Sequence, residues 1–135
     1  DADLSPFVKR GGKLLLWHGF NDSGPSALQT MKYQRDVEAT TGPKIDHPVA
    51  DSVRTFIAPG VGHCRGGAGP DRFDMLTAIE NWVEKGEAPD RIIASKADSK
   101  MTRPLCPYPT IATYKGTGDT NDAANFTCAP MQPAQ

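Results

Sequence analysis

Apolar residues along the chain fall into two short runs, each followed by a turn and a longer segment with helical spacing. Residues 13–17 form a run next to glycines, and residues 53–58 are rich in β-branched and aromatic side chains, so both predict buried strands. Helices are predicted over residues 26–40 and 71–85. The order strand, helix, strand, helix predicts an α/β fold in which a right-handed crossover joins two parallel strands.

The helix over residues 71–85 has the clearest pattern of the chain. One face carries its large apolar side chains, with the tryptophan expected in the core: Phe73, Leu76, Ile79, Trp82 and Val83. Residues 43–51 predict an irregular loop. Beyond the second helix the pattern weakens, and short strands are predicted near residues 92–94 and 111–114, the latter within a tail rich in proline, glycine, asparagine and aspartate.

Composition narrows the class of protein. A chain of 135 residues has the size of one domain, and its 38% hydrophobic and 23% charged residues are typical of a globular protein. With a net charge of −1 and no run of lysine or arginine, neither nucleic acid nor a membrane is expected as a partner. The first residues lack the features of a signal peptide, so a leader has been removed or the chain begins partway through a longer protein.

Two residues with catalytic chemistry follow the two predicted strands. Asp22 lies about five residues past the first strand, and His63 lies about five residues past the second, within a glycine-rich segment. The carboxyl ends of parallel strands meet at one edge of a sheet, so Asp22 and His63 are expected to lie together. A carboxylate that accepts the Nδ1–H of an imidazole orients the ring as general base for a nucleophile.

Each of these residues also has a simpler interpretation. An aspartate after a strand often caps the next helix, and a histidine in a glycine-rich loop is often a surface or core residue. His18, Asp22 and His63 together would also form a usable set of metal ligands. The Gly-x-Ser-x-Gly pattern of a nucleophilic serine is absent, because the flanking glycines are lacking at every serine: Ser5, Ser23, Ser26, Ser52, Ser95 and Ser99.

Four segments, in chain order, resemble the tannase and feruloyl esterase family. Residues 14–22 are similar to its strand and His-Gly-x-x-Asp motif, and residues 58–67 to its Pro-Gly-x-Gly-His-Cys-x-Gly-Gly motif. Residues 81–92 resemble the helix that follows, and residues 102–128 resemble the C-terminal signature that contains Leu-Cys-Pro-Tyr-Pro. The resemblance covers nearly the whole chain.

The resemblance implies the C-terminal part of an α/β-hydrolase fold, with parallel strands and flanking helices over residues 1–100 and a loop-rich tail over residues 101–135. Asp22 would be the acid of a catalytic triad and His63 its base. The nucleophilic serine would lie on a missing N-terminal half of the hydrolase or on a partner chain. The implied substrates are feruloyl, other hydroxycinnamoyl, galloyl or related aryl esters, free or on plant polysaccharide, and no cofactor is implied. The alternative is a non-catalytic binding or structural remnant of a hydrolase.

The three cysteines fit the same resemblance. In the family, the cysteine after the catalytic histidine pairs with the cysteine before the nucleophilic serine, so Cys64 would bond to a cysteine outside this chain. Cys106 and Cys128 would then pair and close the tail, contributing roughly 3 kcal/mol. Both bonds imply an oxidising compartment, and therefore a secreted or periplasmic protein. The alternative for Cys64 is a buried free thiol.

Overall fold

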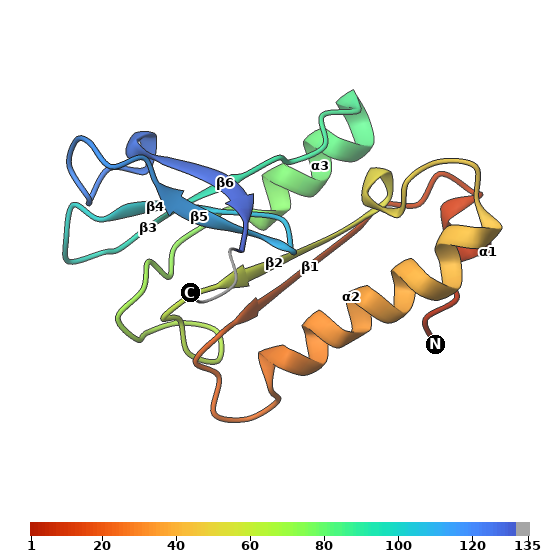
Figure 1. Cartoon of the computed structure of the whole chain (residues 1–135), viewed down its shortest axis with the longest axis horizontal. Helices are drawn as coiled ribbons and strands as arrows, with labels where there is room; N and C mark the ends of the chain where they lie inside the picture. Colours follow the sequence, from red (N-terminus) through yellow and green to blue (C-terminus); the bar gives the residue numbers. More distant parts are fainter. Residues whose placement is uncertain (132–135) are drawn as a thin grey trace.

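The computed structural model describes residues 1–131, and a pair of parallel strands lies at its centre (Figure 1). The strands β1 (Leu14–Gly19) and β2 (Val53–Ala58) run in register from Leu14 opposite Val53 to Gly19 opposite Ala58. The helix α2 (Ala27–Thr41) belongs to the crossover between them. The remaining elements are α1 (Ser5–Val8), the 3₁₀ turns η1 (Gly42–Lys44), η2 (Val49–Asp51) and η3 (Ala123–Asn125), α3 (Met75–Lys85), β3 (Ile92–Ser95), β4 (Thr102–Leu105), β5 (Thr110–Tyr114) and β6 (Phe126–Pro130).

Both faces of the β1–β2 pair are covered, as expected for parallel strands. On one face Val53 packs in a cluster with Val37 of α2, and the buried Thr55 hydroxyl donates a 2.8 Å hydrogen bond to Oε1 of Gln34. On the other face the alternate β2 residues, Phe56 and Ala58, pack against β3 and β4. Figure 1 shows α2 on one side of the pair and α3 on the other.

Phe56 is the largest fully buried side chain of this core. We expect Phe56→Ala to lower the free energy of unfolding by about 3–5 kcal/mol, because it removes buried apolar area and leaves a cavity. Leu76→Ala is the matched control, since Leu76 is 66% exposed on α3 and its truncation should change stability by no more than about 0.5 kcal/mol. Urea titration of the two variants measures the difference, and equal losses would contradict this assignment of the core.

The helix predicted over residues 71–85 is shorter in the structure. It begins at Met75, and the Asp74 carboxylate caps it by accepting the Thr77 N–H at 2.9 Å. The prediction of one buried face is wrong for Leu76 and Val83, which are exposed, and correct for Trp82. Phe73 precedes the helix and packs edge-on against Trp17 of β1, with 5.0 Å between the ring centroids.

The C-terminal tail contains more strands than its composition indicated. β4 pairs with β3, and β5 pairs with β6, both antiparallel, whereas only strands near residues 92–94 and 111–114 were predicted. Cys106 and Cys128 form the expected disulfide. The predicted boundary between residues 100 and 101 falls in the β3–β4 connection. The last residues of the predicted tail, 132–135, lie outside the described residues. No helix within residues 1–131 is long and apolar enough to span a membrane.

Candidate active site

The loops that follow β1 and β2 are joined through their backbones at one edge of the strand pair. The Phe20 N–H donates to the Ala58 carbonyl, and the Asn21 N–H donates to the Val61 carbonyl, both at 2.9 Å. Because β1 extends to Gly19, Asp22 follows the strand by three residues rather than about five. The two predicted site residues are therefore carried by loops that are hydrogen-bonded to each other.

Asp22 and His63 meet, as the strand order predicted. Nδ1 of His63 lies 2.7 Å from Oδ2 of Asp22. The carboxylate is enclosed, with its side chain 3% exposed, whereas the imidazole is 69% exposed. The Gly24 N–H donates to Oδ1 at 2.8 Å, and this bond, followed by the hydrogen bond to His63, holds the pKa of Asp22 below its usual value despite its desolvation.

The arrangement leaves one ring nitrogen of His63 available for chemistry. With Nδ1 donating to Asp22, the neutral ring carries its lone pair on Nε2, which has no hydrogen-bond partner within residues 1–131. An exposed imidazole can accept a proton from a nucleophile at Nε2 and return it while its Nδ1 is bonded to a buried carboxylate. The pair can therefore act as base and acid of a triad, for a nucleophile that is brought to Nε2.

The glycine-rich loop that carries His63 is held by contacts that the sequence did not predict. Asp71 accepts the Gly66 N–H at 2.7 Å, and Nζ of Lys96 donates to the Gly67 carbonyl at 2.7 Å. The hydrogen bond from Gly66 is the main cause that lowers the pKa of Asp71. Gly67 needs to be glycine, because its φ is +88° and a Cβ there would lie 2.1 Å from the Gly60 oxygen.

Gly19 is the point of closest approach between β1 and the loop of His63. A Cβ at this position would lie 2.1 Å from the Gly62 oxygen, a backbone atom that cannot turn away. We expect Gly19→Ala to push the His63 loop off Asp22 and to lower kcat by about a hundredfold. Gly42→Ala is the control, because its Cβ would meet only Val49 at 3.7 Å and kcat should not change. Steady-state kinetics of both variants in the full-length protein measure the effect, and a normal kcat for Gly19→Ala would contradict this role of the contact.

His18 is a third member of the site whose role sequence reasoning missed. Its Nε2 lies 3.2 Å from Oδ2 of Asp22 and 3.0 Å from the Pro25 carbonyl, and its Nδ1 lies 2.7 Å from the Thr30 hydroxyl. The i, i+4 spacing of His18 and Asp22 was visible, but it was interpreted only as a possible metal set. Both ring nitrogens are engaged by the protein, and no group of three or more His, Cys, Asp or Glu side chains is placed to hold a metal ion within the described residues.

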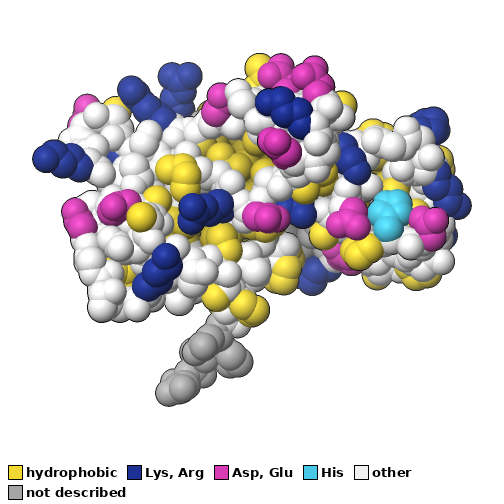
Figure 2. Space-filling model, turned by 90° about the horizontal axis from the view of Figure 1, so that it is seen from above, with side chains coloured by type: hydrophobic (Ala, Val, Ile, Leu, Met, Phe, Trp, Pro, Cys, Tyr) yellow, Lys and Arg dark blue, Asp and Glu magenta, His cyan; other side chains and the backbone are white. Residues whose placement is uncertain are grey.

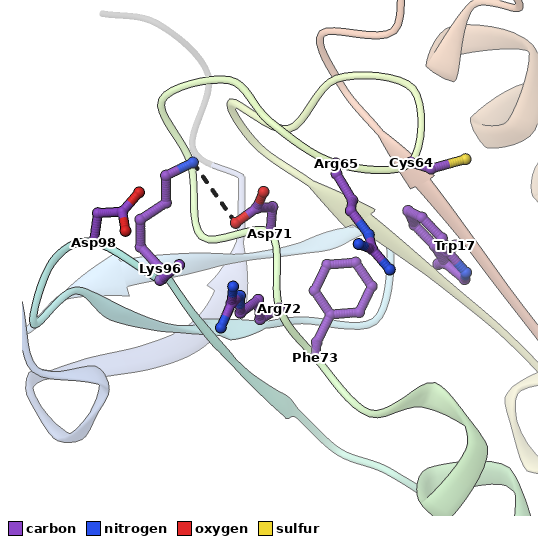
Figure 3. A pocket seen from close by; sticks show the side chains of 9 residues that line it. Trp17, Cys64, Arg65, Asp71, Arg72, Phe73, Lys96 and Asp98 are labelled. Carbon is purple, nitrogen blue, oxygen red and sulfur yellow. Dashed lines mark ion pairs between the residues drawn. The ribbon is translucent and has the colours of Figure 1, made fainter.

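Cys64, next to His63, carries the only free thiol among residues 1–131, and this thiol is exposed rather than buried. A cavity of about 640 Å³ begins beside it (Figure 3). Aromatic side chains and three cationic ones share its lining: Trp17 and Phe73 with Arg65, Arg72 and Lys96. Figure 3 shows Lys96 directed toward Asp71 at the far end of the cavity from Cys64. Neither Asp22 nor His63 lines this cavity, although Cys64, the neighbour of His63, does.

Comparison with known proteins places this geometry in a family. Residues 1–129 match the family described as tannase and feruloyl esterase. Mono(2-hydroxyethyl) terephthalate hydrolase of Piscinibacter sakaiensis is 49% identical over 134 residues, 95% of this chain and 21% of that protein. A probable feruloyl esterase of Arthroderma benhamiae is 42% identical over 138 residues, 96% of this chain and 25% of that protein. The chain thus spans about a quarter of the length of the curated relatives it matches.

Solved structures agree with the sequence comparison. Feruloyl esterase B of Aspergillus oryzae superposes with a TM-score of 0.85 at 30% identity, over 96% of this chain and 29% of that one. Tannin acyl hydrolase of Aspergillus niger has the same fold over this region, with a TM-score of 0.73 at 24% identity.

Proposed function

Because the chain belongs to the tannase and feruloyl esterase family, we propose that it supplies the acid and the base of a serine carboxylic ester hydrolase. Asp22 is the acid and His63 the base. The observation that carries the proposal is the 2.7 Å contact between an enclosed carboxylate and an exposed imidazole at the carboxyl ends of adjacent parallel strands. The nucleophile is a serine outside these 135 residues, since no serine here has the glycine-flanked pattern.

The reaction follows from the orientation of the imidazole. Nε2 of His63 takes the proton of the serine hydroxyl as its oxygen attacks the ester carbonyl, and Asp22 stabilises the imidazolium that forms. The imidazolium then protonates the leaving alkoxide, which leaves an acyl-enzyme. Water attacks the acyl group with His63 again as base, releasing the carboxylic acid and the serine.

Surface features of the chain support a larger hydrolase around it. Within residues 1–131, the outer edge of β1 has no partner strand, although both its faces are packed. Figure 2 shows hydrophobic side chains gathered across the middle of one face, among charged ones. We infer that further parallel strands continue the sheet of an α/β-hydrolase from β1. Residues 1–100 then form the C-terminal part of its catalytic domain, with the residues from 101 onward as its tail.

The exposed thiol of Cys64 supports a covalent link to the same larger protein. A disulfide from Cys64 to a cysteine outside the chain would fix the His63 loop against the rest of the site. Together with the Cys106–Cys128 bond, it favours an oxidising compartment, so we propose that the protein is secreted or periplasmic.

The proposed substrates are esters of aromatic carboxylic acids, small or attached to plant polysaccharide. Support comes from the names of relatives that are 42–49% identical, which specify feruloyl and terephthalate esters.

We propose to compare kcat/KM of the full-length protein for methyl ferulate, methyl gallate and mono(2-hydroxyethyl) terephthalate with that for methyl hexanoate. At least one aromatic ester should be preferred by about a hundredfold. Equal rates would contradict the aromatic specificity, and no turnover of any ester would favour the non-catalytic alternative.

A further inference from the structure

We propose that His18 is a positioning residue for the catalytic carboxylate, an inference that rests on the proposed roles of Asp22 and His63. His18 is the last residue but one of β1, and its side chain is 13% exposed, beside that of Asp22. Its Nε2 and Nδ1 of His63 approach the same oxygen, Oδ2 of Asp22, at 3.2 Å and 2.7 Å. Asp22 thus lies between two imidazoles that differ in exposure and in role.

The partners of His18 determine which of its nitrogens carries the proton. The Pro25 carbonyl, 3.0 Å from Nε2, can only accept a hydrogen bond, so Nε2 is the donor. The Thr30 hydroxyl, 2.7 Å from Nδ1, can donate to that nitrogen. Thr30 lies in the first turn of α2 and binds the ring on its other side, so the Nε2–H donates to the Pro25 carbonyl while Nε2 lies 3.2 Å from Oδ2 of Asp22.

A fixed ring beside Oδ2 matters because Asp22 sits in a turn rather than in a helix or strand. The Gly24 N–H binds Oδ1, and the His18 ring, which is hydrogen-bonded to Pro25 in the same turn, lies against Oδ2, so the carboxylate is held before His63 engages it. The ionisable and polar groups that face His18 are Asp22 from the turn, Thr30 from α2 and the Pro25 carbonyl. His18 therefore contacts the carboxylate and binds the end of its turn without competing with His63 for protons from a nucleophile, and it acts through Asp22.

Two substitutions of matched shape test this role in the full-length protein. His18→Gln keeps an N–H donor near the position of Nε2, whereas His18→Met has nearly the same length and no donor. We expect His18→Met to lower kcat about 10–100-fold with KM within about twofold, and His18→Gln to recover most of that loss. The low-field NMR resonance of the His63 Nδ1 proton should shift in the methionine variant and return toward its original position in the glutamine variant.

Controls separate this inference from the proposed function. His47 also contacts an aspartate, Asp46 at 2.9 Å, but it lies in a different loop, so His47→Met should have wild-type kcat. Equal kcat losses in His18→Gln and His18→Met, or a normal kcat in His18→Met while His63→Ala is inactive, would overturn the role of His18 alone. Retained turnover in His63→Ala would instead overturn the proposed function, and the inference with it.

If His18→Met does not fold, Thr30→Val tests the role of His18 instead, because it removes only the hydroxyl that binds Nδ1 of the ring. A severalfold lower kcat supports the proposal, and a normal kcat overturns it.

Discussion

Replacing His63 by alanine in the full-length protein is expected to lower kcat by about 10⁴–10⁶-fold and to leave the thermal unfolding midpoint unchanged. The loss is large because Nε2 of His63 both accepts the serine proton and returns it to the leaving group. The other imidazole beside Asp22, that of His18, has both ring nitrogens bonded to Thr30 and Pro25. Stability should not change, because the imidazole is 69% exposed and little packing is lost. Single-turnover kinetics with an aromatic ester, beside a thermal melt, measure both quantities.

The control for this substitution is a histidine outside the site. His47→Ala removes a half-exposed imidazole with an aspartate neighbour of its own, and its kcat should equal that of the unaltered protein. Turnover by His63→Ala within about tenfold of the unaltered protein would contradict the assignment of His63 as general base.

Replacing Asp22 by asparagine should lower kcat by about 10⁴-fold. Asp22 accepts on both oxygens, from Gly24 on Oδ1 and from His63 on Oδ2. An amide has one acceptor oxygen, so in Asp22→Asn either the glycine N–H or the imidazole N–H faces a donor. The tautomer of His63 that places the lone pair on Nε2 is then no longer favoured, although the volume of the side chain is unchanged. Initial rates of ester hydrolysis across a pH series measure the loss.

Mild acid should not neutralise the Asp22 carboxylate in the unaltered protein. Because the Gly24 hydrogen bond lowers its pKa, Asp22 stays ionised at pH values at which an ordinary aspartate begins to take up a proton. Asp46→Asn, in the exposed Asp46–His47 pair, is the matched control and should keep full activity. An Asp22→Asn variant as active as this control would show that the carboxylate charge is not needed.

The strand pair and the meeting of Asp22 with His63 could be predicted because each rests on a local pattern. Two short apolar runs separated by one helix favour parallel pairing, and parallel pairing places the residues after both strands at one edge. The resemblance to a family then distinguished this pair from a helix cap and a surface histidine. Neither step needed long-range packing, which is why both could be derived from the sequence.

The errors arise where packing between distant segments overrides the local pattern. Pro104 lies within β4, and Pro130 ends β6; proline argues against a strand, yet both pair in two-stranded ribbons in which a lost N–H is tolerated. Leu76 and Val83 fit the apolar face of a helix, but α3 turns the side of Trp82 inward instead. The role of His18 depends on a hydroxyl twelve residues away on α2, which no local pattern indicates.

The central claim is that His63 and Asp22 activate a serine that lies outside this chain. Its most direct test is to treat the full-length protein with a serine-directed phosphonate and to locate the labelled residue by peptide mass mapping. We predict a label on one serine outside residues 1–135, formed roughly a thousandfold more slowly in His63→Ala. A label on a serine within the chain, such as Ser23 or Ser26 beside the site, or an unchanged labelling rate in His63→Ala, would contradict the claim.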